Sequence, residues 1–246
     1  TNAADANKAT GTGANEGMGG GIYVGGGCTL TMQDNVQLTG NTSAKSGGAI
    51  CALGATVDIT NCTLKGNEAG DKGGAICAVK DGAPSNTPAT VTIEGGTIGG
   101  TNAADANKAT GSDGEGGGIY VGDNCTLNMQ APAGGTQGVR LIGNTAAKSG
   151  GGVYAEGATV NITNCTLKGN KAKNSGGAIC GVMGSNVARI TISGGTIGGT
   201  GADANKATGT GADGKGGGIS ISDGCTLTLQ NNVQVTGNTA QKGTGI

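Results

Sequence analysis

Cysteine, asparagine and threonine are the residues of this chain that recur at spacings where they could do chemistry. The 246 residues include eight cysteines but no histidine, phenylalanine or tryptophan. Without histidine the chain lacks the commonest general base and the commonest metal ligand. Its acidic residues are scattered, so no pair of carboxylates is placed for glycosidase or lyase chemistry. We therefore expect no enzyme, no catalytic residue, no cofactor and no metal site, and a carbohydrate-active enzyme is the least favoured class.

Net charge and hydropathy limit the classes of partner that the chain is expected to bind. The formal net charge is −1, from 15 basic and 16 acidic residues, and no basic stripe stands out. Few aromatic rings are available for base stacking, so we expect no nucleic-acid partner. No run of 18 apolar residues occurs, which predicts no membrane insertion in this segment.

Two anchors recur along the chain and define a repeat. The first is Gly-Gly followed, after one residue, by an aliphatic residue: Ile22, Ile50, Ile76, Ile119, Val153, Ile179, Ile219 and, in a degenerate copy, Ile246. The second is an asparagine that precedes the next Gly-Gly: Asn7, Asn41, Asn67, Asn107, Asn144, Asn170, Asn205 and Asn238. Two anchors in phase indicate about eight repeats.

Each repeat contains three short stretches of period-two alternation, rich in Val, Ile and Thr and bounded by Gly or Asn. This pattern predicts three short strands. Equivalent strands recur between repeats rather than within one, so each strand should pair with its counterpart one coil away. The chain is therefore expected to be an all-β, single parallel β-helix, or β-solenoid, of about eight coils. Stacked aliphatic columns would fill its narrow core without aromatic residues.

The coils differ in threes, which gives a three-coil super-repeat. One super-repeat spans 97 residues from Ile22 to Ile119, and the next spans 100 residues from Ile119 to Ile219. We predict one continuous solenoid over 1–246, a segment of a longer array: a partial coil (1–21), super-repeat 1 (22–118), super-repeat 2 (119–218) and the start of super-repeat 3 (219–246). Every third coil carries an inserted loop before its asparagine, as in "TNAADANKAT".

Three cysteines follow the inward aliphatic residue and should therefore point away from the core. Cys51 and Cys77 lie on adjacent coils, about 5 Å apart, which permits a disulfide. Cys180 occupies the same column with no cysteine neighbour, so it is either an inert surface thiol or a candidate for a bond to another chain. The other cysteines are expected inside the core.

Two further columns are expected along the stack. The asparagine anchors fit left-handed turns whose side-chain amides could hydrogen-bond along the stack. Threonines should form an outward face: Thr29, Thr31, Thr56, Thr90, Thr92, Thr126, Thr159, Thr191, Thr226 and Thr228. Such a face resembles the ice-binding face of solenoid antifreeze proteins, although high β-propensity on exposed strands is sufficient to explain it.

The strings "LTGNTSAKSGGAI" and "LKGNEAGDKGGAI", with their later copies, resemble the repeat of polymorphic outer-membrane proteins. That family pairs Phe-x-x-Asn with Gly-Gly-Ala-Ile, and an aliphatic residue stands here in place of Phe. The resemblance implies a right-handed β-helix of the autotransporter-passenger type on a bacterial, extracellular cell surface.

We therefore expect a non-enzymatic structural protein, a surface filament or adhesin stalk that self-assembles by stacking coils. Further coils or identical subunits would abut both ends. The alternatives are an adhesin that contacts a host or neighbouring cell surface through the inserted loops, and an ice-binding protein that uses the threonine face.

Overall fold

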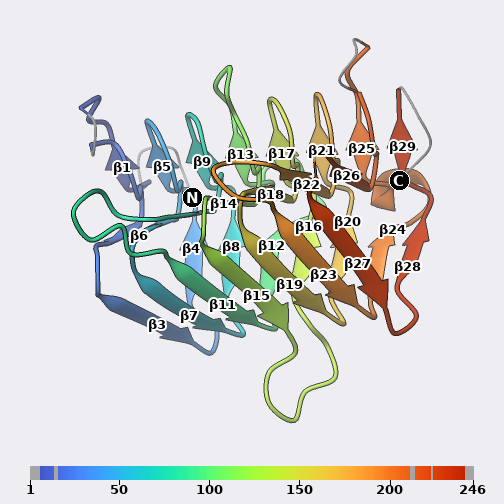
Figure 1. Cartoon of the computed structure of the whole chain (residues 1–246), viewed down its shortest axis with the longest axis horizontal. Coiled ribbons are helices and arrows are strands. Elements are labelled where there is room, and N and C mark those ends of the chain that lie inside the picture. The colour runs from blue at the N-terminus through green and yellow to red at the C-terminus, as the bar shows by residue number, and fades with distance from the viewer. Residues whose placement is uncertain (1–5, 14–15, 211–213, 223, 242–246) are drawn as a thin grey trace.

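The computed structural model is a parallel β-helix, which confirms the predicted fold (Figure 1). It describes residues 6–13, 16–210, 214–222 and 224–241; residues 1–5 of the predicted partial coil and the repeat anchor Ile246 lie outside this range. The chain winds through four sheets, here called A to D, in which all paired neighbours are parallel and lie one coil apart. The described coils are coil 1 (22–49), coil 2 (50–75), coil 3 (76–118), coil 4 (119–152), coil 5 (153–178), coil 6 (179–218) and coil 7 (219–241).

Each coil enters at sheet B and passes through C and D. Sheet B contains β2 (Ile22–Val24), β6 (Ile50–Leu53), β10 (Ile76–Val79), β14 (Ile119–Val121), β18 (Val153–Glu156), β22 (Ile179–Val182) and β26 (Ile219–Ile221). Sheet C contains β3 (Thr29–Gln33), β7 (Thr56–Thr60), β11 (Thr90–Glu94), β15 (Thr126–Gln130), β19 (Thr159–Thr163), β23 (Arg189–Ser193) and β27 (Thr226–Gln230). Sheet D contains β4 (Gln37–Thr39), β8 (Thr63–Lys65), β12 (Thr97–Gly99), β16 (Arg140–Ile142), β20 (Thr166–Lys168), β24 (Thr196–Gly198) and β28 (Gln234–Thr236).

A fourth, narrow ladder follows the asparagine anchor and adds to the three predicted strands. Sheet A contains β1 (Lys8–Ala9), β5 (Thr42–Ser43), β9 (Glu68–Ala69), β13 (Lys108–Ala109), β17 (Thr145–Ala146), β21 (Lys171–Ala172), β25 (Lys206–Ala207) and β29 (Thr239–Ala240). In each two-residue strand the second residue, Ala or Ser, points inward, and the first points outward. A short 3₁₀ helix, η2 (Gly201–Asp203), lies in the inserted loop of coil 6.

The core is a set of aliphatic columns, each one side chain deep. Ile50, Ile76 and Ile119 are in register across sheet B, and each has no exposed surface. Equivalent columns run through sheets C and D, where Val91 pairs with Leu127 and Ile98 with Leu141. Burial of such side chains stabilises a fold by about 1.5–3 kcal/mol each, so aliphatic residues alone supply the core.

The Gly-Gly corner has two separate requirements. Gly73 adopts a φ of 68°, a region that disfavours other residues. The next residue, Gly74, lies so close to the following coil that a Cβ atom would collide with the carbonyl oxygen of Gly117. The corner therefore needs one glycine for its backbone angle and a second for its close contact with the neighbouring coil.

Candidate functional site

The asparagine column is a hydrogen-bonded ladder, buried from Asn41 to Asn205. Asn144 donates from Nδ2 to Oδ1 of Asn170 at 3.0 Å and to the carbonyl oxygen of Ile98 at 3.0 Å. Its own Oδ1 accepts from Nδ2 of Asn107 at 2.9 Å and from the backbone N–H of that residue at 3.3 Å. The same pattern links the described members from Asn7 to Asn238. The column satisfies its own polar groups and stabilises the stack.

The expectation that these asparagines adopt left-handed backbone angles is wrong. None of them has a positive φ among the described residues. Before five of the eight asparagines a glycine takes that conformation instead, as at Gly66 (φ 63°) and Gly169 (φ 65°), whereas alanine precedes Asn7, Asn107 and Asn205. The division is physical: glycine turns the chain without steric cost, and asparagine then places its amide inward.

The predicted threonine face lies on sheet C. Thr29, Thr56, Thr90, Thr126 and Thr159 stand in register on consecutive strands. Arg189 interrupts this column before Thr226. In the next column Asp58 lies between Thr31 and Thr92, and two asparagines precede Thr191 and Thr228. The face is ordered, but it carries charges in both columns.

Cys51, Cys77 and Cys180 leave the main core yet are not on the surface. Each is at most 3% exposed, and together with Tyr120 and Tyr154 they form a second apolar cluster on the outer face of sheet B. Met18, Val79 and Val182 pack against this cluster. The interpretation of Cys180 as a surface thiol available to another chain is therefore wrong. Burial raises its pKa to about 12, which keeps it protonated and unreactive.

Cys51 and Cys77 are register partners on β6 and β10. Both are free thiols in the structure, and the hydrogen bond that the Cys77 thiol makes with Cys51, together with burial, raises the pKa of Cys77 well above its usual value. Their positions fit the distance that a disulfide requires. The disulfide between them stays a prediction.

An ionic network lies over the tyrosines of this cluster. The rings of Tyr120 and Tyr154 are stacked with centroids 5.7 Å apart, and Lys72 Nζ lies 4.3 Å from the Tyr120 ring centroid. Lys72 also donates to the Tyr120 hydroxyl at 2.8 Å, and that hydroxyl donates to Glu156. These contacts hold the loops after sheet A against sheet B.

The inserted loops of coils 3 and 6 fold back onto the preceding coil. In coil 3 the carbonyl oxygen of Asp105 accepts from Gly66 N–H at 2.9 Å, and the Asp105 carboxylate lies 3.1 Å from Lys65 Nζ. In coil 6 Asp203 makes the same two contacts, to Gly169 N–H at 2.9 Å and to Lys168 Nζ at 3.0 Å. Each loop is thus fixed at both its backbone and its side chain.

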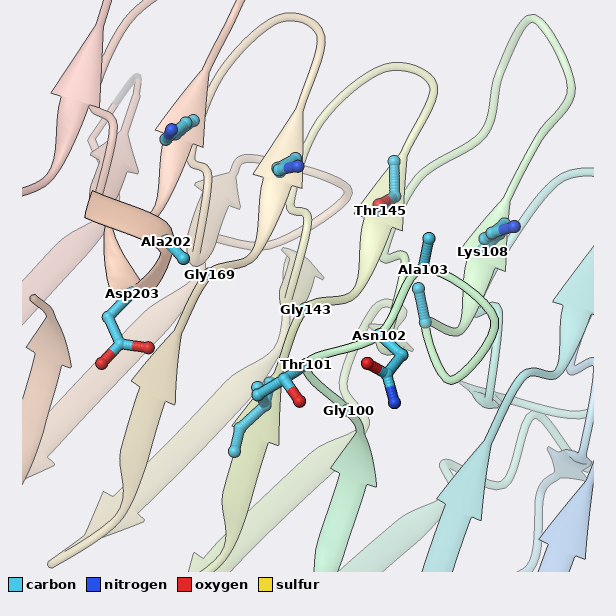
Figure 2. A pocket seen from close by; sticks show the side chains of 14 residues that line it. Gly100, Thr101, Asn102, Ala103, Lys108, Gly143, Thr145, Gly169, Ala202 and Asp203 are labelled. Carbon is cyan, nitrogen blue, oxygen red and sulfur yellow. The ribbon is translucent and has the colours of Figure 1, made fainter. Parts of the chain in front are cut away.

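Between these two loops lies a cavity of about 280 Å³. Figure 2 shows Asn102 and Ala103 on one side of it, Ala202 and Asp203 on the other, and Gly143 and Gly169 between. The sheet A residues Lys108, Thr145, Lys171 and Lys206 also line it. Sequence reasoning missed these lysines. The available signal was their fixed place directly after the asparagine anchor, where sheet A points outward.

Four segments match the family model of the Chlamydia polymorphic membrane protein repeat: residues 35–53, 61–79, 138–156 and 164–182. The chain thus carries four copies of a repeat of the polymorphic membrane protein type. Each match runs from just before sheet D, through the asparagine and the Gly-Gly corner, to sheet B of the next coil. The inserted loops of coils 3 and 6 lie outside the matched segments. No curated protein and no solved structure shows significant similarity to the chain.

The repeat indicates an outer-membrane or surface-exposed protein. Among the described residues, no helix has the length and hydropathy needed to cross a membrane. The same residues contain no group of three or more His, Cys, Asp or Glu side chains placed to hold a metal ion.

Proposed function

We propose that this chain is a non-enzymatic structural segment of an extracellular surface rod, a filament or adhesin stalk. Further coils or identical subunits continue its stack at both ends. The observation that carries the proposal is the in-register stacking of similar coils. Sheets B, C and D each pair one strand from every described coil in parallel, and four segments match the same repeat.

Unpaired edge strands with apolar side chains pair readily with another chain. Strands of similar length recur in parallel along the described stack, so a further coil would pair in the same way as those already present. Repetition supports the structural role too. A catalytic site needs one unique constellation, whereas successive super-repeats are near copies.

Electron microscopy of surface material from the producing cells, labelled with an antibody to this chain, tests the proposal. We expect labelled rods that are longer than the described stack of coils, in which each coil adds about 4.8 Å to the length. Separate, monodisperse particles with closed ends would overturn the filament and stalk roles.

Ice binding is the alternative that the ordered threonine face supports. Asp58 and Arg189 lie within its columns, and charges disturb an ordered water layer. We expect no thermal hysteresis from the purified chain, and a clear hysteresis would favour this alternative over the stalk.

A further inference from the structure

Coils 2 and 5 are equivalent in the super-repeat but differ in charge on one surface. In coil 2 the outward residue after the asparagine anchor is Glu68, which is the register partner of Lys108. In coil 5 this position is Lys171, the register partner of Lys206. The basic column of coils 3 to 6 therefore reads Lys108, Thr145, Lys171 and Lys206, with no acidic residue in it.

The ammonium groups of these three lysines make no hydrogen bond or ion pair within the part of the chain that the structure describes. Lys171 and Lys206 lie on adjacent parallel strands, whose separation is about 4.8 Å. Like charges this close repel each other, and an anion placed between them removes the repulsion. The nearest acidic group of the cavity wall, Asp203, is already paired with Lys168 at 3.0 Å.

The shape of the site limits what can reach the lysines. The loop of coil 3 walls one side of the cavity and the loop of coil 6 walls the other, as Figure 2 shows. Lys108 and Lys206 are three coils apart, which is about 14 Å. A single small anion cannot span that distance. The ligand must be narrow, extended and multiply charged.

The residues that line the cavity distinguish between the two classes of extended polyanion, nucleic acids and acidic polysaccharides. No aromatic residue lines the cavity, so nucleic-acid bases have no stacking platform. Thr101, Asn102 and Thr145 instead provide hydroxyl and amide groups, which match sugar hydroxyls. We propose that the groove between the inserted loops binds an acidic polysaccharide, with Lys108, Lys171 and Lys206 pairing with its carboxylate or sulfate groups. This deepens the adhesin part of the proposed function and rests on surface exposure, not on end-to-end stacking.

Isothermal titration of the purified full chain tests the proposal with two probes, heparin oligosaccharides and polygalacturonate oligosaccharides. Binding to at least one probe is expected. Its affinity should decrease when the NaCl concentration is raised from about 0.05 M to about 0.5 M, because salt screens exposed charges. Sulfate and carboxylate sources are distinguished by which probe binds more tightly. Neutral dextran serves as the control and is expected not to bind.

The super-repeat itself supplies the matched variants. Lys171→Glu places in coil 5 the residue that coil 2 carries at the same position, so folding is preserved while binding is expected to weaken about tenfold or more. Glu68→Lys extends the basic column by one coil, and a dissociation constant about threefold lower is expected. Lys80→Glu makes the same charge change outside the groove and should leave the affinity unchanged.

Three results would overturn the proposal. The first is no binding of either oligosaccharide at low salt. The second is an equal loss in Lys171→Glu and Lys80→Glu, which would indicate only a general charge effect. The third is tighter binding to oligothymidylate or to phosphatidylserine vesicles than to either oligosaccharide. Rods seen by electron microscopy would persist in each case, so failure here is distinguishable from failure of the stalk role.

Discussion

Coils 2 and 5 show which positions a solenoid fixes and which it leaves free. Most of their inward residues are the same in both copies: Val57 and Val160, Ile59 and Ile162, Cys62 and Cys165, Leu64 and Leu167, Asn67 and Asn170; Ile50 and Val153 differ by one methylene. Several outward residues differ: Cys51 and Tyr154, Asp58 and Asn161, Glu68 and Lys171. Inward residues contact both neighbouring coils, so a change propagates along the stack. Outward residues meet solvent or a loop, and they can acquire a new binding role without cost to the core.

The largest expected effect concerns a pair of cysteines at one repeat position. Cys28 of coil 1 is exposed, whereas Cys125 of coil 4 is buried and its pKa is raised by burial to about 11. Only thiolates react with iodoacetamide, so at about pH 8 Cys28 should be labelled at least about 100-fold faster than Cys125. Mass spectrometry of timed samples measures this ratio, and urea-unfolded protein serves as the control.

The same labelling measurement tests whether further coils or subunits cover Cys28. If further coils or subunits cover the end strands, Cys28 in native rods should become as slow to label as Cys125. Fast labelling of Cys28 in intact rods would contradict coverage at that end.

The asparagine ladder provides the next largest effect. Asn67→Ala and Asn170→Ala each remove an amide that donates two hydrogen bonds and accepts two more inside the core. The partners left behind are buried and unsatisfied, so each variant should lose about 3 kcal/mol of unfolding free energy in urea. Because the two sites are equivalent, their losses should agree. A loss confined to one copy would show that the two super-repeats are not equivalent in their cores.

Alkaline pH tests the second apolar cluster. The pKa of Cys180 is raised by burial to about 12, so the folded chain keeps its proton while the unfolded thiol, near 9.0, loses its own. The stabilising effect is complete below about pH 9 and is lost as the pH rises toward 12. At about pH 10 the loss is about 1 kcal/mol.

Thermal unfolding at about pH 7 and about pH 10 measures this change. Cys180→Ser is the matched control because coil 7 carries Ser220 at the same position. The variant should lose less stability on going to alkaline pH. An equal loss in both proteins would assign the effect to other groups.

The fold could be predicted from the sequence because its signals are local and repeated. Period-two alternation marks the strands, and Gly-Gly with Asn sets the register, so Ile50, Ile76 and Ile119 could be aligned without coordinates. The hydrogen bonds between asparagines could also be predicted, because they follow from the stacking of equivalent residues. The sequence does not tell which residue takes the left-handed backbone angle, because glycine and asparagine both tolerate it and are adjacent at positions such as Gly66 and Asn67.

The site could be predicted only in part. Alternation correctly gives the direction of Cys180, but its burial depends on Met18 and Val182 over the outer face of sheet B, and alternation says nothing about that cover. The lysine groove was not predicted, because a net charge near zero gives no sign of a local column of basic residues. Glu68 also interrupts the column in the first super-repeat, and the inserted loops that wall the groove lie far from Lys171 in sequence.

The smallest expected effect concerns the ion pairs that fix the inserted loops. Lys65 with Asp105 and Lys168 with Asp203 are equivalent, at 3.1 and 3.0 Å. All four side chains are partly exposed, so Lys65→Gln and Lys168→Gln should each cost only about 0.5 kcal/mol. Loss of the Lys168 pair also frees the Asp203 carboxylate beside the groove, which should weaken polysaccharide binding about twofold. Neither Lys65 nor Asp105 lines the groove, and in Lys65→Gln the bond from Gly66 N–H to the Asp105 carbonyl oxygen still holds the loop. Both variants should therefore lose stability, whereas only Lys168→Gln should lose affinity. Equal binding by both would show that the paired Asp203 has no influence on the lysine column.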